Sequence, residues 1–290
     1  MKSRMTTVLL FFILVLGVAI LLYPTVSDYW NSFHQSRAIA SYVEEVASVD
    51  PMVYDYEWSK AKAYNEMLLE KDNRWIVEEE ELEQYNSVLN LNGSGIMGYI
   101  EIPKIGCALP IYHGTDEAVL QIAIGHIQGT SLPTGGKGNH CVVSGHRGLP
   151  SAKLFTDLDQ LIEGDVFMMR VLNEVLTYEV DQVLIVLPHE LDALAFDPEN
   201  DYCTLVTCTP YGINSHRLLV RGHRIANISE AKTILVPPDA KQIDTIIIMP
   251  IVAAPMLIVL FFYMMSSTGH TRRRNRDRRI ARERINKYLK

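Results

Sequence analysis

The chain has 290 residues, of which 48% are hydrophobic, and its formal net charge at pH 7 is −7. This length is sufficient for one sizeable globular domain with appended segments. The four cysteines are few and have no CxxC spacing, so the composition indicates neither a dense disulfide framework nor a zinc site. We expect no cofactor and no metal.

Two stretches are apolar enough to cross a membrane. Val8–Tyr23 is almost entirely apolar and follows Lys2 and Arg4, and residues 245–265 form a second apolar run. At about 1.5 Å per residue, this second run reaches across a hydrocarbon core of about 30 Å. The first run could instead be a cleaved signal peptide, because its apolar core is short. Residues 25–27 make only a weak cleavage site, which favours an uncleaved anchor.

The basic residues are concentrated at the two ends of the chain. His270–Lys290 contains ten Lys or Arg and two acids, whereas the chain between Arg4 and this tail contains 15 basic and 32 acidic residues. This asymmetry predicts both termini in the cytoplasm and the acidic middle outside the cell membrane. An Arg-rich tail could instead bind nucleic acid, but directly after a span it indicates topology and contact with anionic headgroups. We expect no nucleic-acid partner.

The region between the two apolar runs changes character along the chain. Residues 33–47 and 56–69 have helical spacing, with Asp50-Pro51 as a break between them, and residues 70–83 read as a solvated acidic connector. From Gly98 onward, short β-branched and aliphatic runs alternate with Gly, Pro and Asn turns. Short helices are expected at 117–124 and 152–161. Expected strands are 99–102, 109–112, 140–144, 166–171, 175–187, 204–207 and 218–220.

Many short strands at modest spacing predict a mainly β fold, with a closed or nearly closed barrel. The expected order is an N-terminal anchor or signal segment (1–24), an extracellular helical prelude (25–84), a β-barrel catalytic domain (85–228), a linker (229–244), a C-terminal transmembrane helix (245–265) and a basic cytoplasmic tail (266–290).

Cys208 lies at the end of the strand 204–207, and a loop containing Pro210 and Gly212 leads into the next strand. Because side chains alternate along a strand, only one of His216 and Arg217 can face Cys208. A thiol near His and Arg is a candidate nucleophile, since a cationic neighbour favours the reactive thiolate. The alternative is a buried filler residue, which is how we interpret Cys107, Cys141 and Cys203, although an outside location leaves one disulfide open.

Three histidines compete as the partner of this thiol. His146 stands between Gly145 and Arg147-Gly148 at a strand end, where functional groups tend to sit. His140 begins the same strand and fits a structural role better, whereas His216 is too close to Cys208 to exclude. The residues alone leave the choice open.

Thr204–Cys208 (Thr-Leu-Val-Thr-Cys), with Arg217 nine residues on, resembles the sortase signature of Thr-Leu-x-Thr-Cys followed by Arg. Gly98–Ile105, Leu109–Thr115 and Ser144–Gly148 are similar to motifs of the class C, pilin-polymerising sortases. The resemblance covers roughly residues 85–225, and several motifs in order make it specific. It implies a sortase β-barrel of about eight strands, with catalytic residues Cys208, His146 and Arg217.

The resemblance also implies a reaction and its partners. Cys208 would cleave an LPXTG-like sorting signal after Thr through a thioester, and a lysine of a neighbouring pilin would accept the acyl group, which polymerises the pilins. One alternative is a sortase that attaches proteins to cell-wall peptidoglycan. Another is a non-enzymatic surface module in which Cys208 is a buried filler.

Class C sortases commonly have a lid with an Asp-Pro-aromatic tripeptide that occupies the active-site cleft. This chain has Asp72-Asn73-Arg74-Trp75 instead, so an Asp and an aromatic ring are present but separated. Asp72 and Trp75 are therefore the candidate lid residues, and the departure from the pattern leaves open whether a lid works here.

Overall fold

The computed structural model describes residues 2–227, 257–259 and 261–263. The chain divides into two compact units, one made of Met1–Val26 with Asp239–Lys290 and the other of Ser27–Pro238. The expected linker (229–244) and basic tail (266–290) lie outside the described residues, as does most of the expected second span (245–265). The unit Ser27–Pro238 holds the β-barrel, and its fold is what positions the candidate site.

Helix α1 (Lys2–Ser48) joins the apolar N-terminal run and the following helical stretch into one 47-residue helix, with Pro24 inside it. The sequence predicted two segments here, an anchor ending at residue 24 and a separate helix from residue 33. By length and composition, Val8–Ser48 is the one candidate membrane span among the described residues. The boundary between the two compact units falls within α1.

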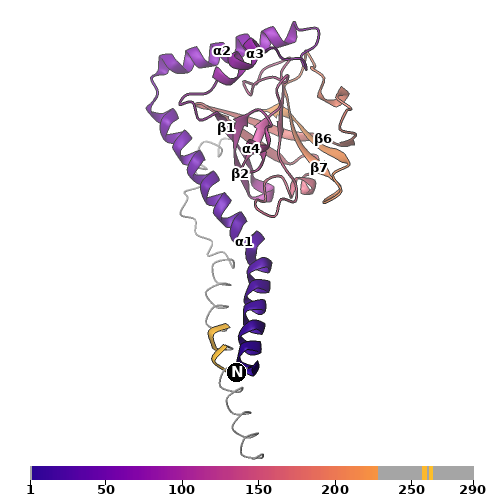
Figure 1. Cartoon of the computed structure of the whole chain (residues 1–290). Coiled ribbons are helices and arrows are strands. Elements are labelled where there is room, and N and C mark those ends of the chain that lie inside the picture. The colour runs from indigo at the N-terminus through magenta and orange to yellow at the C-terminus, as the bar shows by residue number, and fades with distance from the viewer. Residues whose placement is uncertain (1, 228–256, 260, 264–290) are drawn as a thin grey trace, which may run out of the picture. The chain divides into compact units, whose positions relative to one another are not determined.

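Two further helices precede the barrel (Figure 1). Helix α2 (Pro51–Leu69) starts at a proline and is capped by Asp50, whose Oδ1 accepts a hydrogen bond from the backbone N of Met52 at 2.8 Å. Helix α3 (Glu79–Ser87) starts within the acidic connector and has a capping box between Glu78 and Glu81. Buried residues of both helices belong to the main core, so the prelude is packed against the barrel.

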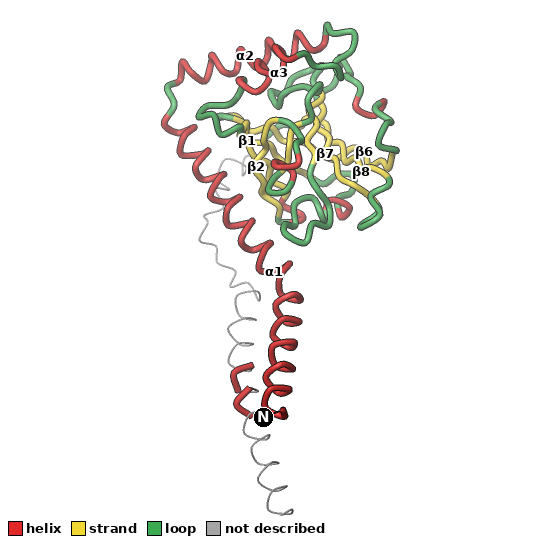
Figure 2. The backbone as a smooth tube through the Cα atoms, in the orientation of Figure 1, coloured by secondary structure: helices red, strands yellow, loops and turns green. Residues whose placement is uncertain are grey.

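Eight strands close into a barrel in the order β1-β2-β3-β4-β7-β8-β6-β5, which confirms the predicted closed β-barrel. Figure 2 shows these strands in yellow. The pairs β2–β3 and β4–β7 are parallel, and the other pairs are antiparallel. The strands are β1 (Ile96–Ile102), β2 (Cys107–His113), β3 (Ile124–His126), β4 (His140–Ser144), β5 (Val166–Val171), β6 (Glu174–Val186), β7 (Tyr202–Thr209) and β8 (His216–Ile225).

Of the two short helices predicted within the barrel region, the first is confirmed in part and the second is wrong. Helix α4 (Glu117–Leu120) is shorter than predicted, because Ile124 is fully buried and pairs with Ile111 as the start of β3. Residues 152–161 form a loop with one short 3-10 turn (Leu158–Gln160). Its backbone forms local turn bonds, such as Leu158 N to the carbonyl of Phe155, and a longer-range bond from Phe155 N to the carbonyl of His146.

All four cysteines are free. Cys141 and Cys203 are opposite each other in the β4–β7 ladder and are buried, which confirms that they fill the core. Cys107 is only half-buried at the start of β2. Cys208, near the C-terminal end of β7, is also half-buried.

Candidate active site

The register between β7 and β8 decides which side chain shares a face with Cys208. Cys208 is directly opposite Arg217, whereas Thr209 is opposite His216. Residues directly opposite each other in an antiparallel ladder point to the same side of the sheet. Arg217, and not His216, therefore lies on the face of Cys208.

Local contacts hold the guanidinium of Arg217 at the β7–β8 turn. Its Nη1 donates hydrogen bonds to the carbonyl oxygens of Asn214, at 3.3 Å, and His216, at 3.1 Å. The Arg217 side chain is half-buried. The guanidinium of Arg217 thus lies at the same end of the barrel as the Cys208 thiol.

The parallel pairing of β4 and β7 places His146. Ser144 is the register partner of Val206, and the backbone N of Gly145 donates to the carbonyl of Val206 at 3.0 Å. The Thr207 hydroxyl donates to the carbonyl of Gly145 at 2.8 Å. Both strands run in the same direction, so His146 and Cys208 each follow this last register pair by two residues on neighbouring chains.

Glycines on both sides of His146 are required by packing. A Cβ on Gly145 would lie 2.8 Å from side-chain atoms of both Ile124 and Phe155. Gly148 has a φ of +74°, and a Cβ there would lie 2.7 Å from the ring of Tyr211. The glycine-bounded strand end predicted from the sequence is therefore a loop whose glycines lie in close contact with neighbouring side chains.

A carboxylate that the sequence did not reveal lies next to His146. Glu117, at the start of α4, has its Oε2 3.8 Å from Nε2 of His146. Its other oxygen accepts a hydrogen bond from the side-chain amide of Gln121. The Glu117 side chain is 73% exposed, so its attraction to a protonated imidazole is strongly screened by water.

Arg147 ties the His146 loop to the end of β7. Its Nη1 donates to the hydroxyl of Thr209 at 3.3 Å, and its Nη2 forms an ion pair with Asp159. Thr209 directly follows Cys208. The Arg147 side chain therefore connects the loop of His146 to the end of β7, in addition to the pairing of β4 with β7.

An apolar cluster covers the outer face of the sheet beside Cys208. We call it the outer cluster. Val206 belongs to this cluster, and its side chain points to the same face of β7 as that of Cys208, which is two residues later in the strand. It consists of buried Val142, Leu194, Val206 and Leu219, with half-buried Trp75, Ile127, Leu184, Val186 and Ala193 packed against them.

Trp75, one of the two candidate lid residues, packs on the outer cluster, whereas Asp72 is exposed. Arg74, which the sequence analysis did not single out, fixes this segment. Its Nη2 donates to the carbonyl of Leu194 at 2.7 Å, and its guanidinium carbon lies 4.5 Å from the ring of Trp75 and 3.9 Å from that of Phe196. Burial lowers the pKa of Arg74 from its usual value.

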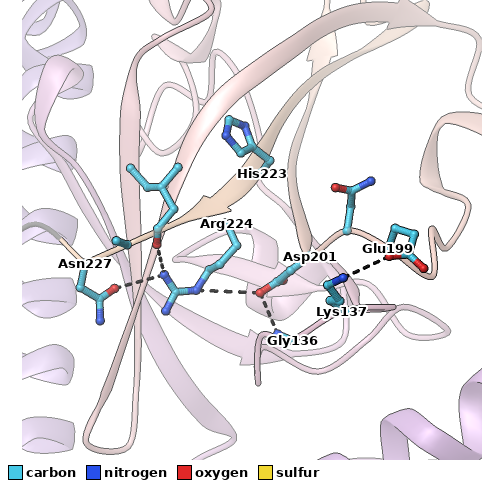
Figure 3. Close-up of a pocket in the computed structure, with 10 residues that line it drawn as sticks. Gly136, Lys137, Glu199, Asp201, His223, Arg224 and Asn227 are labelled. Atoms are coloured by element: carbon cyan, nitrogen blue, oxygen red, sulfur yellow. Dashed lines mark hydrogen bonds and ion pairs between the residues drawn. The ribbon is translucent and has the colours of Figure 1, made fainter.

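A pocket of about 550 Å³ lies at the opposite end of β7 (Figure 3). Asp201 accepts a hydrogen bond from the backbone N of Gly136 at 2.7 Å and lies 3.9 Å from Nε of Arg224. The guanidinium of Arg224 also donates to the carbonyls of Val175, Thr177 and Ile225. Asp201 and Arg224 are thus engaged in structural hydrogen bonds at this end of the barrel. We therefore take the Cys208 region, and not this pocket, as the candidate reactive site.

Comparison with known proteins identifies the family of the chain. The Sortase domain family matches residues 100–225. The crystal structure of sortase C1 from Streptococcus agalactiae is 50% identical, with a TM-score of 0.65, and the match covers 66% of this chain and 100% of that chain. Sortase C of Streptococcus pneumoniae is 39% identical, with a TM-score of 0.59, over 66% of this chain and 97% of that one.

Sortase A from Corynebacterium diphtheriae, solved as a lid mutant, is 41% identical, with a TM-score of 0.58, over 63% of this chain and 99% of that one. Sortase D of Bacillus subtilis (strain 168) is 30% identical over 131 residues, which are 44% of this chain and 63% of the relative. The chain thus spans less than two thirds of that curated relative. Because it covers a solved sortase completely at 50% identity, the chain belongs to the sortase family, and its structural relatives include class C sortases.

Proposed function

We propose that this chain is a membrane-anchored cysteine transpeptidase that cleaves an LPXTG-like sorting signal after Thr and transfers the acyl group to a pilin lysine. The observation that carries the proposal is that Cys208 and Arg217 share one face of the sheet, while His146 follows the strand that pairs in parallel with β7. The solved sortase C of S. pneumoniae, described in terms of pilin substrate specificity, supports a pilin as the partner.

In the first half of the reaction, the Cys208 thiolate attacks the carbonyl carbon of the Thr in the sorting signal. The tetrahedral oxyanion forms within reach of the Arg217 guanidinium, and loss of one such donor typically costs about 2.7–4 kcal/mol in the barrier. The Thr–Gly amide bond then breaks, and His146 gives its proton to the departing glycine amine. The products are a thioester on Cys208 and the released C-terminal segment.

In the second half, the lysine amine attacks the thioester carbonyl while His146 removes a proton from it. The C–S bond breaks, an isopeptide bond remains, and Cys208 returns as the thiolate. An amine can outcompete water when the site holds it close to the thioester and excludes solvent. The apolar outer cluster next to Cys208 suits the Leu and Pro of the signal and limits the access of water.

The anchor and the charge asymmetry support a location at the cell membrane, with the barrel outside and both termini in the cytoplasm. A second span at 245–265 and a basic tail at 266–290 are part of this proposal, as are the catalytic roles of Cys208, His146 and Arg217.

The segment Asp72–Trp75 acts as a lid over the outer cluster. Trp75 covers apolar surface that runs up to Cys208, and Arg74 fastens the segment to the β6–β7 loop. Arg74 Nη1 is buried without a hydrogen-bond partner among the described residues, and such a group typically costs about 1–3 kcal/mol. This cost weakens the docked state, so a substrate peptide can displace the lid. The solved lid mutant of the C. diphtheriae sortase supports the presence of a lid.

The proposal is tested by the intact mass of the enzyme after incubation with a Leu-Pro-x-Thr-Gly peptide. We expect an adduct of the Leu-Pro-x-Thr acyl group on the wild type and none on Cys208→Ala, whose thermal unfolding should be unchanged. A variant with Arg74→Ala and Trp75→Ala removes the contacts that hold the lid and leaves α3 intact. If that variant also forms no adduct, the enzymatic proposal is wrong.

The acceptor is tested separately. Adding a folded pilin domain to this acyl-enzyme should give an isopeptide-linked conjugate of the Leu-Pro-x-Thr group with the pilin, and replacing the acceptor lysine should abolish it. Transfer to a peptidoglycan amine with no transfer to pilin would identify a wall-anchoring sortase instead.

A further inference from the structure

Helix α1 contacts the loop that begins at His146, although more than 100 residues separate them in sequence. The side-chain Nδ2 of Asn31 donates to the backbone carbonyl of Ser151 at 2.7 Å. Oδ1 of Asp28 accepts from the backbone N of Lys153 at 2.6 Å. All four residues belong to the compact unit Ser27–Pro238.

The loop returns from these contacts directly to His146. The backbone N of Phe155 donates to the His146 carbonyl at 3.2 Å, and the backbone N of Gly148 donates to the Thr156 hydroxyl at 3.1 Å. Phe155 is fully buried and fixes the base of the loop in the core. The loop is therefore closed at its base by the barrel and held near its tip by α1.

Helix α1 is itself fixed to the barrel by contacts that do not involve this loop. Gln35 Nε2 donates to the carbonyl of Ile122 at 2.6 Å, and the Tyr42 hydroxyl donates to the Met97 carbonyl at 3.1 Å. Positions 28, 31, 35 and 42 have the spacing of a single helix face. A helix anchored at two other points can act as a rigid support for the loop.

We propose that Asp28 and Asn31 are positioning residues, through which α1 holds the His146 loop in its reactive arrangement beside Cys208. This inference rests on the proposed function, because it assumes that His146 is the acid and base of the reaction. It assigns a second role to the helix that bears the apolar N-terminal run. An enzyme that begins after Asn31 should fold but transfer acyl groups more slowly than the full chain.

The test uses the full chain in detergent micelles, with kcat and KM measured for a Leu-Pro-x-Thr-Gly peptide and hydrogen exchange measured at the amides of 149–155. In the double variant Asp28→Ala with Asn31→Ala, we expect kcat to fall about tenfold, because two side-chain hydrogen bonds are lost, with little change in KM. Exchange of the loop amides should become faster.

Two matched variants separate positioning from a general effect on α1. The single variant Asp28→Asn keeps a side-chain oxygen that can accept from the backbone N of Lys153, so its kcat should be close to that of the wild type. Ser32→Ala alters an exposed residue on the same helical turn and should behave as the wild type. An unchanged kcat or unchanged loop exchange in the double variant would overturn the proposal, as would an equal loss in Ser32→Ala. Absence of any acyl adduct on the wild-type chain would instead refute the proposed function itself.

Discussion

Cys208 and Arg217 are directly opposite each other in the β7–β8 ladder, while the neighbouring pair is Thr209 with His216. A shift of one residue in this register would place His216 on the thiol face and turn Arg217 away. The chemistry available at Cys208 is therefore set by strand register, and adjacent residues of β8 have different expected roles.

Replacing Arg217 by Ala should lower kcat for peptide cleavage by about 10²–10³-fold, because a preorganised donor to the oxyanion is lost. His216→Ala is the matched control and should change kcat by less than about threefold, since its side chain faces the other side of the sheet. Steady-state cleavage of a fluorogenic sorting peptide measures both. Equal losses in the two variants would contradict the assignment of Arg217.

Removing the ring of Trp75 should expose Cys208. We expect Trp75→Ala to be alkylated by iodoacetamide several times faster than the wild type, because the ring covers the outer cluster beside the thiol. Arg74→Ala should act in the same direction, since it removes the hydrogen bond to Leu194. Ile76→Ala, at a side chain that is 63% exposed, is the control. Alkylation at the wild-type rate in Trp75→Ala would count against the lid.

Glu117→Gln should lower kcat by about fivefold at most, because an exposed ion pair is typically worth about 0.2–1 kcal/mol. The same pair should weaken in salt, so the difference between Glu117→Gln and wild type should shrink between 50 mM and 1 M NaCl. A loss greater than about fiftyfold would show that Glu117 acts directly in the reaction.

Burial and the nearby charges of Arg221 and Arg74 lower the pKa of His140 to about 4. Its Nδ1 lies 2.9 Å from the carbonyl of Ala195, which can only accept, so Nδ1 donates and Nε2 accepts from the Thr204 hydroxyl at 2.7 Å. Between pH 6.5 and about 4, the unfolded chain binds a proton at this histidine that the folded chain does not. The free energy of unfolding therefore falls as the pH falls, by roughly 3 kcal/mol in total.

Urea unfolding of the wild type and of His140→Asn at pH 7 and pH 4.5 measures this effect. The wild type should lose more stability between the two pH values than the variant, which has no imidazole to titrate. An equal loss in both proteins would show that other groups control the acid response.

Tyr42→Phe should destabilise the fold by about 1–3 kcal/mol, because it leaves buried backbone groups without a partner. The Tyr42 hydroxyl accepts from the backbone N of Leu172 at 2.8 Å and donates to the Met97 carbonyl at 3.1 Å. Tyr56→Phe, at a ring that is 62% exposed, is the control and should be nearly neutral. Chemical denaturation monitored by tryptophan fluorescence provides the comparison.

Much of the barrel could be predicted from local sequence. The strands β4 and β5 have the predicted bounds, since β-branched runs between turn residues have a strong local preference for extended structure. The three-residue strand β3 was missed, because a run this short shows no alternation and only its pairing with β2 and β4 makes it a strand. The apolar residues of 152–161 are spaced as in a helix, which is why a helix was predicted. In the structure the same residues are buried against the barrel from a loop.

For the candidate site, the sequence by itself determined the reactive residue types and their alternation: a thiol at a strand end, a histidine between glycines, and an adjacent His and Arg. Only the tertiary structure decided which of them meet. Register chose Arg217 over His216, and the parallel pairing of β4 with β7 brings the strand that leads into His146 next to the strand of Cys208. The contacts of Glu117, Arg74 and Asn31 join segments 29 to 120 residues apart. Periodicity describes one element at a time, whereas such contacts depend on how separate elements pack.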